Sequence, residues 1–108
     1  MANTAQLIEA ICKIIRSSEI PLPITLLNHE VEEAASIIGG VVELCGHERV
    51  ALTRMSIDPE PAAELGLTQG RVAEHGARRI IHCEPGLALL WQIYLRCLRR
   101  VRLQWGHR

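Results

Sequence analysis

Residues Ala62–Arg79 read AAELGLTQGRVAEHGARR, and the fold expected for the chain depends on how this stretch is interpreted. Small residues come first, a glycine follows at position 66, and the stretch ends in paired arginines. The pattern is compatible with two helices joined by a tight turn, and also with a polar surface helix that happens to contain glycine. These two interpretations lead to different functions.

The beginning of the stretch favours a helix followed by a turn. Asp58 can cap a helix that starts at Pro59, because proline is tolerated in the first turn, where its missing N–H is not needed. Gly66 can adopt positive φ without strain, as the turn between two packed helices requires. Thr68 can then cap a second helix. The residues therefore predict a helix-turn-helix over residues 58–82.

The segment LGLTQGRV, residues 65–72, resembles the helix-turn-helix core of bacterial, plasmid and phage regulators. It is most similar to the TrfB/KorA-type plasmid repressors, and the resemblance covers about twenty residues. It implies that the second helix, starting near Thr68, lies in the major groove of operator DNA. It also implies a dimer that regulates transcription.

Six residues of the predicted motif are the expected DNA contacts. Gln69 and Arg71 fall in the first turn of the second helix, where side chains touch base edges. The hydroxyl of Thr68 and two arginines are expected to contact phosphates. The complete expected set is Thr68, Gln69, Arg71, His75, Arg78 and Arg79.

Charge is distributed unevenly along a chain whose formal net charge is zero. Residues 1–60 carry four basic and nine acidic side chains, whereas residues 61–108 carry eight arginines and three glutamates. A basic segment joined to an acidic one is typical of a polyanion-binding element on a scaffold. Aromatic residues make up only 3% of the chain, which argues against stacking of single-stranded nucleic acid.

Helical periodicity extends to both ends of the chain. Residues Thr4–Ser17 are predicted to form a helix capped by Asn3 or Thr4. A second helix is expected from about Asn28, with Asn28 as its cap, to Ile38, where Gly39-Gly40 would end it. Residues 87–104 are predicted to form a long helix, apolar in its first half and rich in arginine in its second.

Two segments between these helices have a different character. The prolines of IPLPIT, residues 20–25, require an extended or turned backbone. Residues 41–57 are ambiguous, because the run ALTRMSI alternates enough to be a strand and is also compatible with a helix. We favour helix from the neighbouring elements. The expected fold is therefore an all-α small helical bundle containing the helix-turn-helix, with a short strand pair before it as the alternative.

The chain is long enough for one domain, 1–108. Within it we expect an acidic helical scaffold over residues 1–57, the helix-turn-helix over 58–82 and a basic helix over 86–105. The four cysteines show no CxxC pair. Cys45, His47, His82 and Cys83 form only a weak zinc motif, and buried cysteines that pack as small hydrophobic residues are the favoured interpretation. We therefore expect no metal, cofactor or enzymatic activity.

The beginning of the chain lacks a sustained apolar run, and the longest apolar block of the whole sequence, residues 87–95, is too short to span a bilayer. We therefore expect a cytoplasmic protein that has reduced cysteines and does not enter membranes. The first hypothesis is a homodimeric regulator that binds double-stranded DNA. Its dimer seam would follow the stripe Leu87, Leu90, Trp91, Tyr94 and Leu98.

Two other functions remain open. One is an interaction or inhibitor protein of phage or plasmid origin without DNA binding, in which the basic C-terminal helix docks on an acidic partner. The acidic N-terminal half is a further surface for a protein partner. The other is a metal or redox sensor that uses the cysteines.

Overall fold

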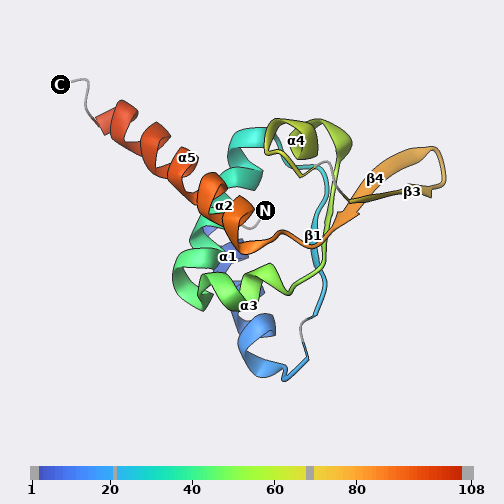
Figure 1. Ribbon diagram of the computed structural model, residues 1–108, viewed down its shortest axis with the longest axis horizontal. Helices are drawn as coiled ribbons and strands as arrows, with labels where there is room; N and C mark the ends of the chain where they lie inside the picture. The colour runs from blue at the N-terminus through green and yellow to red at the C-terminus, as the bar shows by residue number, and fades with distance from the viewer. Residues whose placement is uncertain (1–2, 21, 68–69, 106–108) are drawn as a thin grey trace.

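The chain forms both helices and strands, so the all-α expectation is wrong. The computed structural model describes residues 3–20, 22–67 and 70–105. Within them the elements follow one another as α1 (Thr4–Ser17), β1 (Ile24–Leu26), α2 (Val31–Cys45), α3 (His47–Ala51), β2 (Met55–Ile57), α4 (Pro59–Glu64), β3 (Arg71–His75), β4 (Arg78–Cys83) and α5 (Leu87–Trp105) (Figure 1).

The four strands form one mixed sheet in the order β1-β2-β4-β3. β1 and β2 are parallel, with Ile24 opposite Met55, and the other neighbours are antiparallel. A parallel pair requires a crossover connection, and α2 and α3 supply it here. The ambiguous segment 41–57 therefore divides into the end of α2, the short helix α3 and the strand β2.

The core is one cluster of buried apolar side chains from the strands, α2 and the helices around it. Alternate residues of β1, β2 and β4 point to the same face of the sheet, and on that face Leu26, Ile57 and Ile81 are buried. α2 contacts α1, α3, α4 and α5, so its apolar residues extend around most of the helix. α2 is therefore the central helix of the fold.

Gly39 and Gly40 lie inside α2, and the expectation that they end the helix is wrong. A Cβ on Gly40 would lie 2.4 Å from Ile8 Cδ1 of α1, and one on Gly39 would lie 3.3 Å from Cys97 Sγ of α5. The two glycines therefore let neighbouring helices approach α2 closely. The helix ends instead at Gly46, whose φ of 91° suits glycine. Asn28 is not its cap, because Glu30 holds that position.

The predicted helix-turn-helix is half right. α4 begins after Asp58 as expected, and Gly66 has the positive φ, 77°, that the turn was expected to need. The prediction of a second helix is wrong, because residues 71–75 and 78–83 form the strands β3 and β4. Thr68 and Gln69 lie outside the described residues.

A tight turn joins β3 to β4. His75 pairs with Arg78, so only Gly76 and Ala77 connect the strands. Gly76 has a φ of 64°, and Ala77 is not among the residues with positive φ. Glycine with positive φ at the first central position is the signature of a type II′ turn, whose twist matches that of two antiparallel strands. Gly76 therefore closes a hairpin.

The helices at the two ends of the chain were predicted correctly. α1 spans Thr4–Ser17, and Asn3 caps it through a reciprocal pair of hydrogen bonds with Gln6. α5 spans Leu87–Trp105. In Figure 1, α5 extends from the body at the opposite end to the β3–β4 hairpin. None of the helices in the described part of the chain is long and apolar enough to cross a membrane.

Candidate functional site

The β3–β4 hairpin is the most exposed part of the sheet. β3 is an edge strand, and of its five residues only Ala73 is partly buried. Even Val72 keeps 50% of its surface exposed. Figure 1 shows the hairpin extending beyond the helices that cover the rest of the sheet. The protein thus presents a two-stranded ribbon to solvent.

The two faces of this ribbon differ in charge. Arg71 and His75 lie on one face of β3, and the register places His82 and Arg78 directly opposite them on β4. We call these four residues the basic hairpin face. Glu74 lies on the other face, opposite Arg79. The basic hairpin face therefore contains no carboxylate from either strand of the hairpin.

His82 is held in place from the neighbouring strand. Its Nδ1 lies 2.8 Å from Ser56 Oγ, and the two residues are register partners in β2 and β4. The rings of His82 and His75 meet edge to face, with centroids 6.3 Å apart. These contacts fix the ring orientation at the base of the basic hairpin face.

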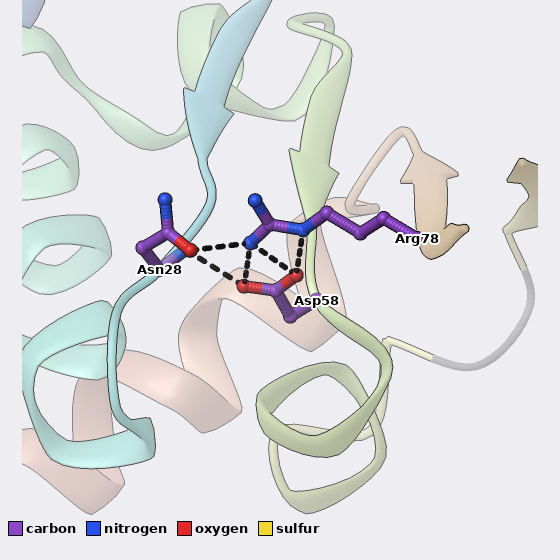
Figure 2. Close-up of polar contacts among 3 residues, drawn as sticks. All are labelled: Asn28, Asp58 and Arg78. Carbon is purple, nitrogen blue, oxygen red and sulfur yellow. Dashed lines mark hydrogen bonds and ion pairs between the residues drawn. The ribbon is translucent and has the colours of Figure 1, made fainter. Parts of the chain in front are cut away.

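Arg78 belongs to a polar network that joins three strand ends (Figure 2). Its Nη2 donates to both carboxylate oxygens of Asp58, at 2.7 and 2.8 Å, and its Nε donates to Oδ1 at 3.0 Å. The same Nη2 donates to Asn28 Oδ1, and the backbone N–H of Asn28 donates to Asp58 Oδ2. Asn28 has a left-handed φ of 66°, a conformation that asparagine tolerates well.

This network sets the ionisation of Asp58. Burial by itself would raise the pKa of Asp58, but the hydrogen bond from the Asn28 amide and the guanidinium of Arg78 outweigh it, so the pKa lies below its ordinary value. Asp58 precedes α4 as its N-cap residue, yet its side chain makes no capping bond. The carboxylate therefore holds the hairpin to the ends of β1 and β2.

The structure separates the residues that were expected to contact DNA. Arg71, His75 and Arg79 lie exposed on the hairpin, whereas Arg78 is engaged by Asp58. Thr68 and Gln69, expected in the same set, lie outside the described residues. Three of the six expected contacts thus gather on one exposed element, although that element is a ribbon and not a helix.

A cleft of about 650 Å³ opens beside the base of the hairpin. Arg71 and His82 belong to its wall, and Arg54, which directly precedes β2, joins them there. Sequence reasoning missed Arg54, because nothing local connects it with residues 71 and 82. Only the pairing of β2 with β4 brings these side chains together.

The four residues of the weak zinc motif do not form a common site. Cys45 and His47 lie where α2 meets α3, whereas His82 and Cys83 lie on β4. No group of three or more metal-ligating side chains occurs among the residues that the structure describes. Cys45 instead neighbours Cys12, and burial together with the hydrogen bond between the two thiols raises the pKa of Cys12 to about 12.

α5 leaves an apolar stripe uncovered. Leu90 and Ile93 are fully buried in the core, but Leu87 and Trp91 keep 52% and 51% of their surface exposed. Trp91 also contacts the ring of His47 of α3, with centroids 5.1 Å apart. Leu90, expected in a dimer seam, thus packs within its own chain, and the exposed stripe starts at Leu87 and Trp91.

Comparison with protein-family models, with curated proteins and with solved structures finds no match to the chain.

Proposed function

We propose that the protein is a cytoplasmic, non-enzymatic transcriptional regulator that binds double-stranded DNA through its β3–β4 hairpin. The observation that carries this proposal is the exposed two-stranded ribbon with Arg71 and His75 on its basic hairpin face. The major groove of B-DNA admits a two-stranded ribbon as well as a helix, and several regulators read DNA with strands. The groove-reading element proposed is thus the hairpin.

Charge supports this choice of element. The hairpin belongs to the basic part of the chain, residues 61–108, with its eight arginines and three glutamates. Arg71 and Arg79 are exposed, and neither guanidinium has a hydrogen bond or ion pair with another residue of the described chain. Unpaired arginines on an exposed ribbon are free to neutralise phosphates and release counterions.

The two faces of the ribbon suggest different roles for its arginines. Neither strand of the hairpin contributes a carboxylate to the basic hairpin face, so we assign this face to the floor of the groove, with Arg71 forming a bidentate contact to guanine. Arg79 lies on the opposite face, next to Glu74, and we assign it to a phosphate. Arg71 would then determine sequence preference, and Arg79 would contribute affinity on any sequence.

We further propose that the regulator is a homodimer whose two subunits contact each other through α5. The exposed stripe of Leu87 and Trp91 continues along the helix through the half-buried Tyr94 and Leu98, at the spacing of four, three and four residues that brings two helices together. The opposite net charges of the two parts of the chain, −5 over residues 1–60 and +5 over residues 61–108, would also favour association of two copies.

Duplex binding at several salt concentrations tests the DNA proposal. Fluorescence anisotropy with labelled mixed-sequence DNA should show an affinity that falls as the salt concentration rises from about 50 to about 200 mM. The logarithm of the association constant should fall against the logarithm of the salt concentration with a slope of about −0.9 per phosphate contact. Arg79→Gln should make the slope shallower, and Lys13→Gln on exposed α1 should not change it. Absence of duplex binding at low salt would contradict the proposal.

A second function is favoured by the stripe on α5. An exposed apolar stripe on a projecting helix also suits a protein-interaction or inhibitor module that docks on an acidic partner. Sedimentation at micromolar concentration separates the two. A dimer supports the regulator, whereas a monomer that also ignores duplex DNA supports the interaction module.

A further inference from the structure

The cleft beside the hairpin has the dimensions of a small-molecule site. Its volume, about 650 Å³, lies within the usual range of ligand pockets. Its described wall includes Gly66 and Leu67 after α4, the end of β4 with His82, and the first turns of α5 with Leu89. Together with Arg54, which is distant from both in sequence, described residues of the segments 66–71 and 82–92 therefore line one concave space.

The charged side chains in this wall are mostly cationic. Arg54 and Arg71 supply two guanidinium groups and His82 an imidazole, and Glu84 is the only carboxylic acid among the described lining residues. The described chain contains no ion pair between Glu84 and either arginine. The wall of the cleft therefore carries a local excess of positive charge.

The arginines of the cleft differ from most others in the described chain. Arg16, Arg49, Arg78 and Arg96 each donate a hydrogen bond to another residue of the protein. Within the described residues, Arg54 and Arg71 have no such partner. Guanidinium groups with unused donors are suited to bind carboxylate or phosphate oxygens.

Apolar surface accompanies this charge. Ala88 and Leu89 line the same cleft, Ala88 exposed and Leu89 half-buried, whereas Leu67 is fully buried behind the wall. Pockets that combine apolar walls with a few convergent charges bind organic molecules whose polar end fixes their orientation. We propose that the cleft binds a small organic dianion, with its charged group on Arg54 and Arg71 and its apolar part against Ala88 and Leu89.

Both a phosphate monoester and a dicarboxylate meet this description. Phenyl phosphate and phthalate are therefore suitable probes, because each carries two negative charges on one side of an aromatic ring. Inorganic phosphate is the comparison that offers charge without an apolar part. Binding can be measured by calorimetry on the protein alone, so failure of this inference and failure of the DNA proposal are distinguishable.

The wild-type protein should bind phenyl phosphate, phthalate or both more tightly than inorganic phosphate. Arg54→Gln should weaken this binding about tenfold, the effect of losing one charged hydrogen bond. Lys13→Gln removes the same charge from exposed α1 and should leave the affinity unchanged. Because Arg54 is exposed and unpaired, its variant should retain the wild-type circular dichroism spectrum.

Amide chemical shifts then locate the ligand. Titration with the tighter of the two probes should move the signals of Gly70, His82 and Leu89, which line the cleft, and leave α1 unchanged. The inference is overturned if neither probe binds at millimolar concentration, or if Arg54→Gln binds as tightly as the wild type. Equal affinity for inorganic phosphate and both aromatic probes would overturn the organic part of the assignment.

Discussion

Replacement of Gly70 by alanine distinguishes the hairpin from the helix that the sequence suggested. A Cβ on Gly70 would lie 2.4 Å from the backbone oxygen of His82 and 2.7 Å from Cys83 Cβ. Neither atom is the end of a flexible side chain, so β3 and β4 would have to separate where the hairpin begins. Overpacking of this kind costs about 1–3 kcal/mol. In a helix the same change would instead stabilise the protein by about 1 kcal/mol.

The sign of the effect can be read from urea unfolding followed by circular dichroism. Gly70→Ala should lower the free energy of unfolding by about 1–3 kcal/mol, whereas Gly86→Ala should cost less than about 1 kcal/mol. Gly86 is a suitable control, because a Cβ there meets nothing within 4 Å. A Gly70→Ala protein as stable as the wild type, or more stable, would refute the close approach of the two strands.

The Asp58–Arg78 pair, the buried Cys12 thiol and the exposed Trp91 side chain each have a measurable consequence. Asp58→Asn should cost about 1–2 kcal/mol in urea unfolding, because it leaves the guanidinium of Arg78 without its counter-ion. The pKa of Asp58 is lowered in the folded state, so its carboxylate contributes to the free energy of unfolding above pH 3.8 and loses this contribution as the pH falls through the folded pKa. The stability of the Asp58→Asn variant should therefore be less sensitive to acid than that of the wild type. Since the pKa of Cys12 is raised to about 12, stability should fall as the pH rises from 9 toward 12, and Cys12→Val should lack this part of the loss. Trp91→Ser should shift the sedimentation coefficient toward that of a monomer, and an unchanged dimer would contradict the seam on α5.

The helices that could be predicted from the sequence are those with strong local signals. α1 and α5 have sustained apolar periodicity, and α4 begins with a capping residue and a proline. The end of α2 could not be predicted, because the role of Gly39 and Gly40 depends on Ile8 and Cys97, which are distant in sequence. Locally, a glycine pair looks like the end of a helix.

The hairpin was missed although a local signal for it exists. Arg71–His75 and Arg78–Cys83 include the β-branched residues Val72, Ile80 and Ile81, and Gly76-Ala77 is a two-residue connection between them. The resemblance of residues 65–72 to a helix-turn-helix outweighed this signal. Because β4 is stabilised by pairing with β2, the competition between helix and strand was decided by contacts outside the segment.

The candidate site was predictable only in part. Arg71, His75 and Arg79 were singled out from the sequence by their positions in the predicted helix-turn-helix, and the structure places all three on the exposed hairpin. The engagement of Arg78 by Asp58 and the place of Arg54 in the cleft both depend on strand pairing. The sequence therefore indicated several charged residues of the candidate site, and the fold determines which of their side chains are free of partners within the described chain.

Amide chemical-shift mapping with duplex DNA tests the proposed function most directly. If the hairpin enters the major groove, addition of a duplex to ¹⁵N-labelled protein should move the signals of Arg71–His75 and Arg78–Cys83 most, and α1 should remain unchanged. Arg71→Gln should reduce those shifts. It should also lower the difference in binding free energy between duplexes of different sequence by about 1–3 kcal/mol. Shifts confined to α5, or no shifts at low salt, would contradict DNA recognition by the hairpin.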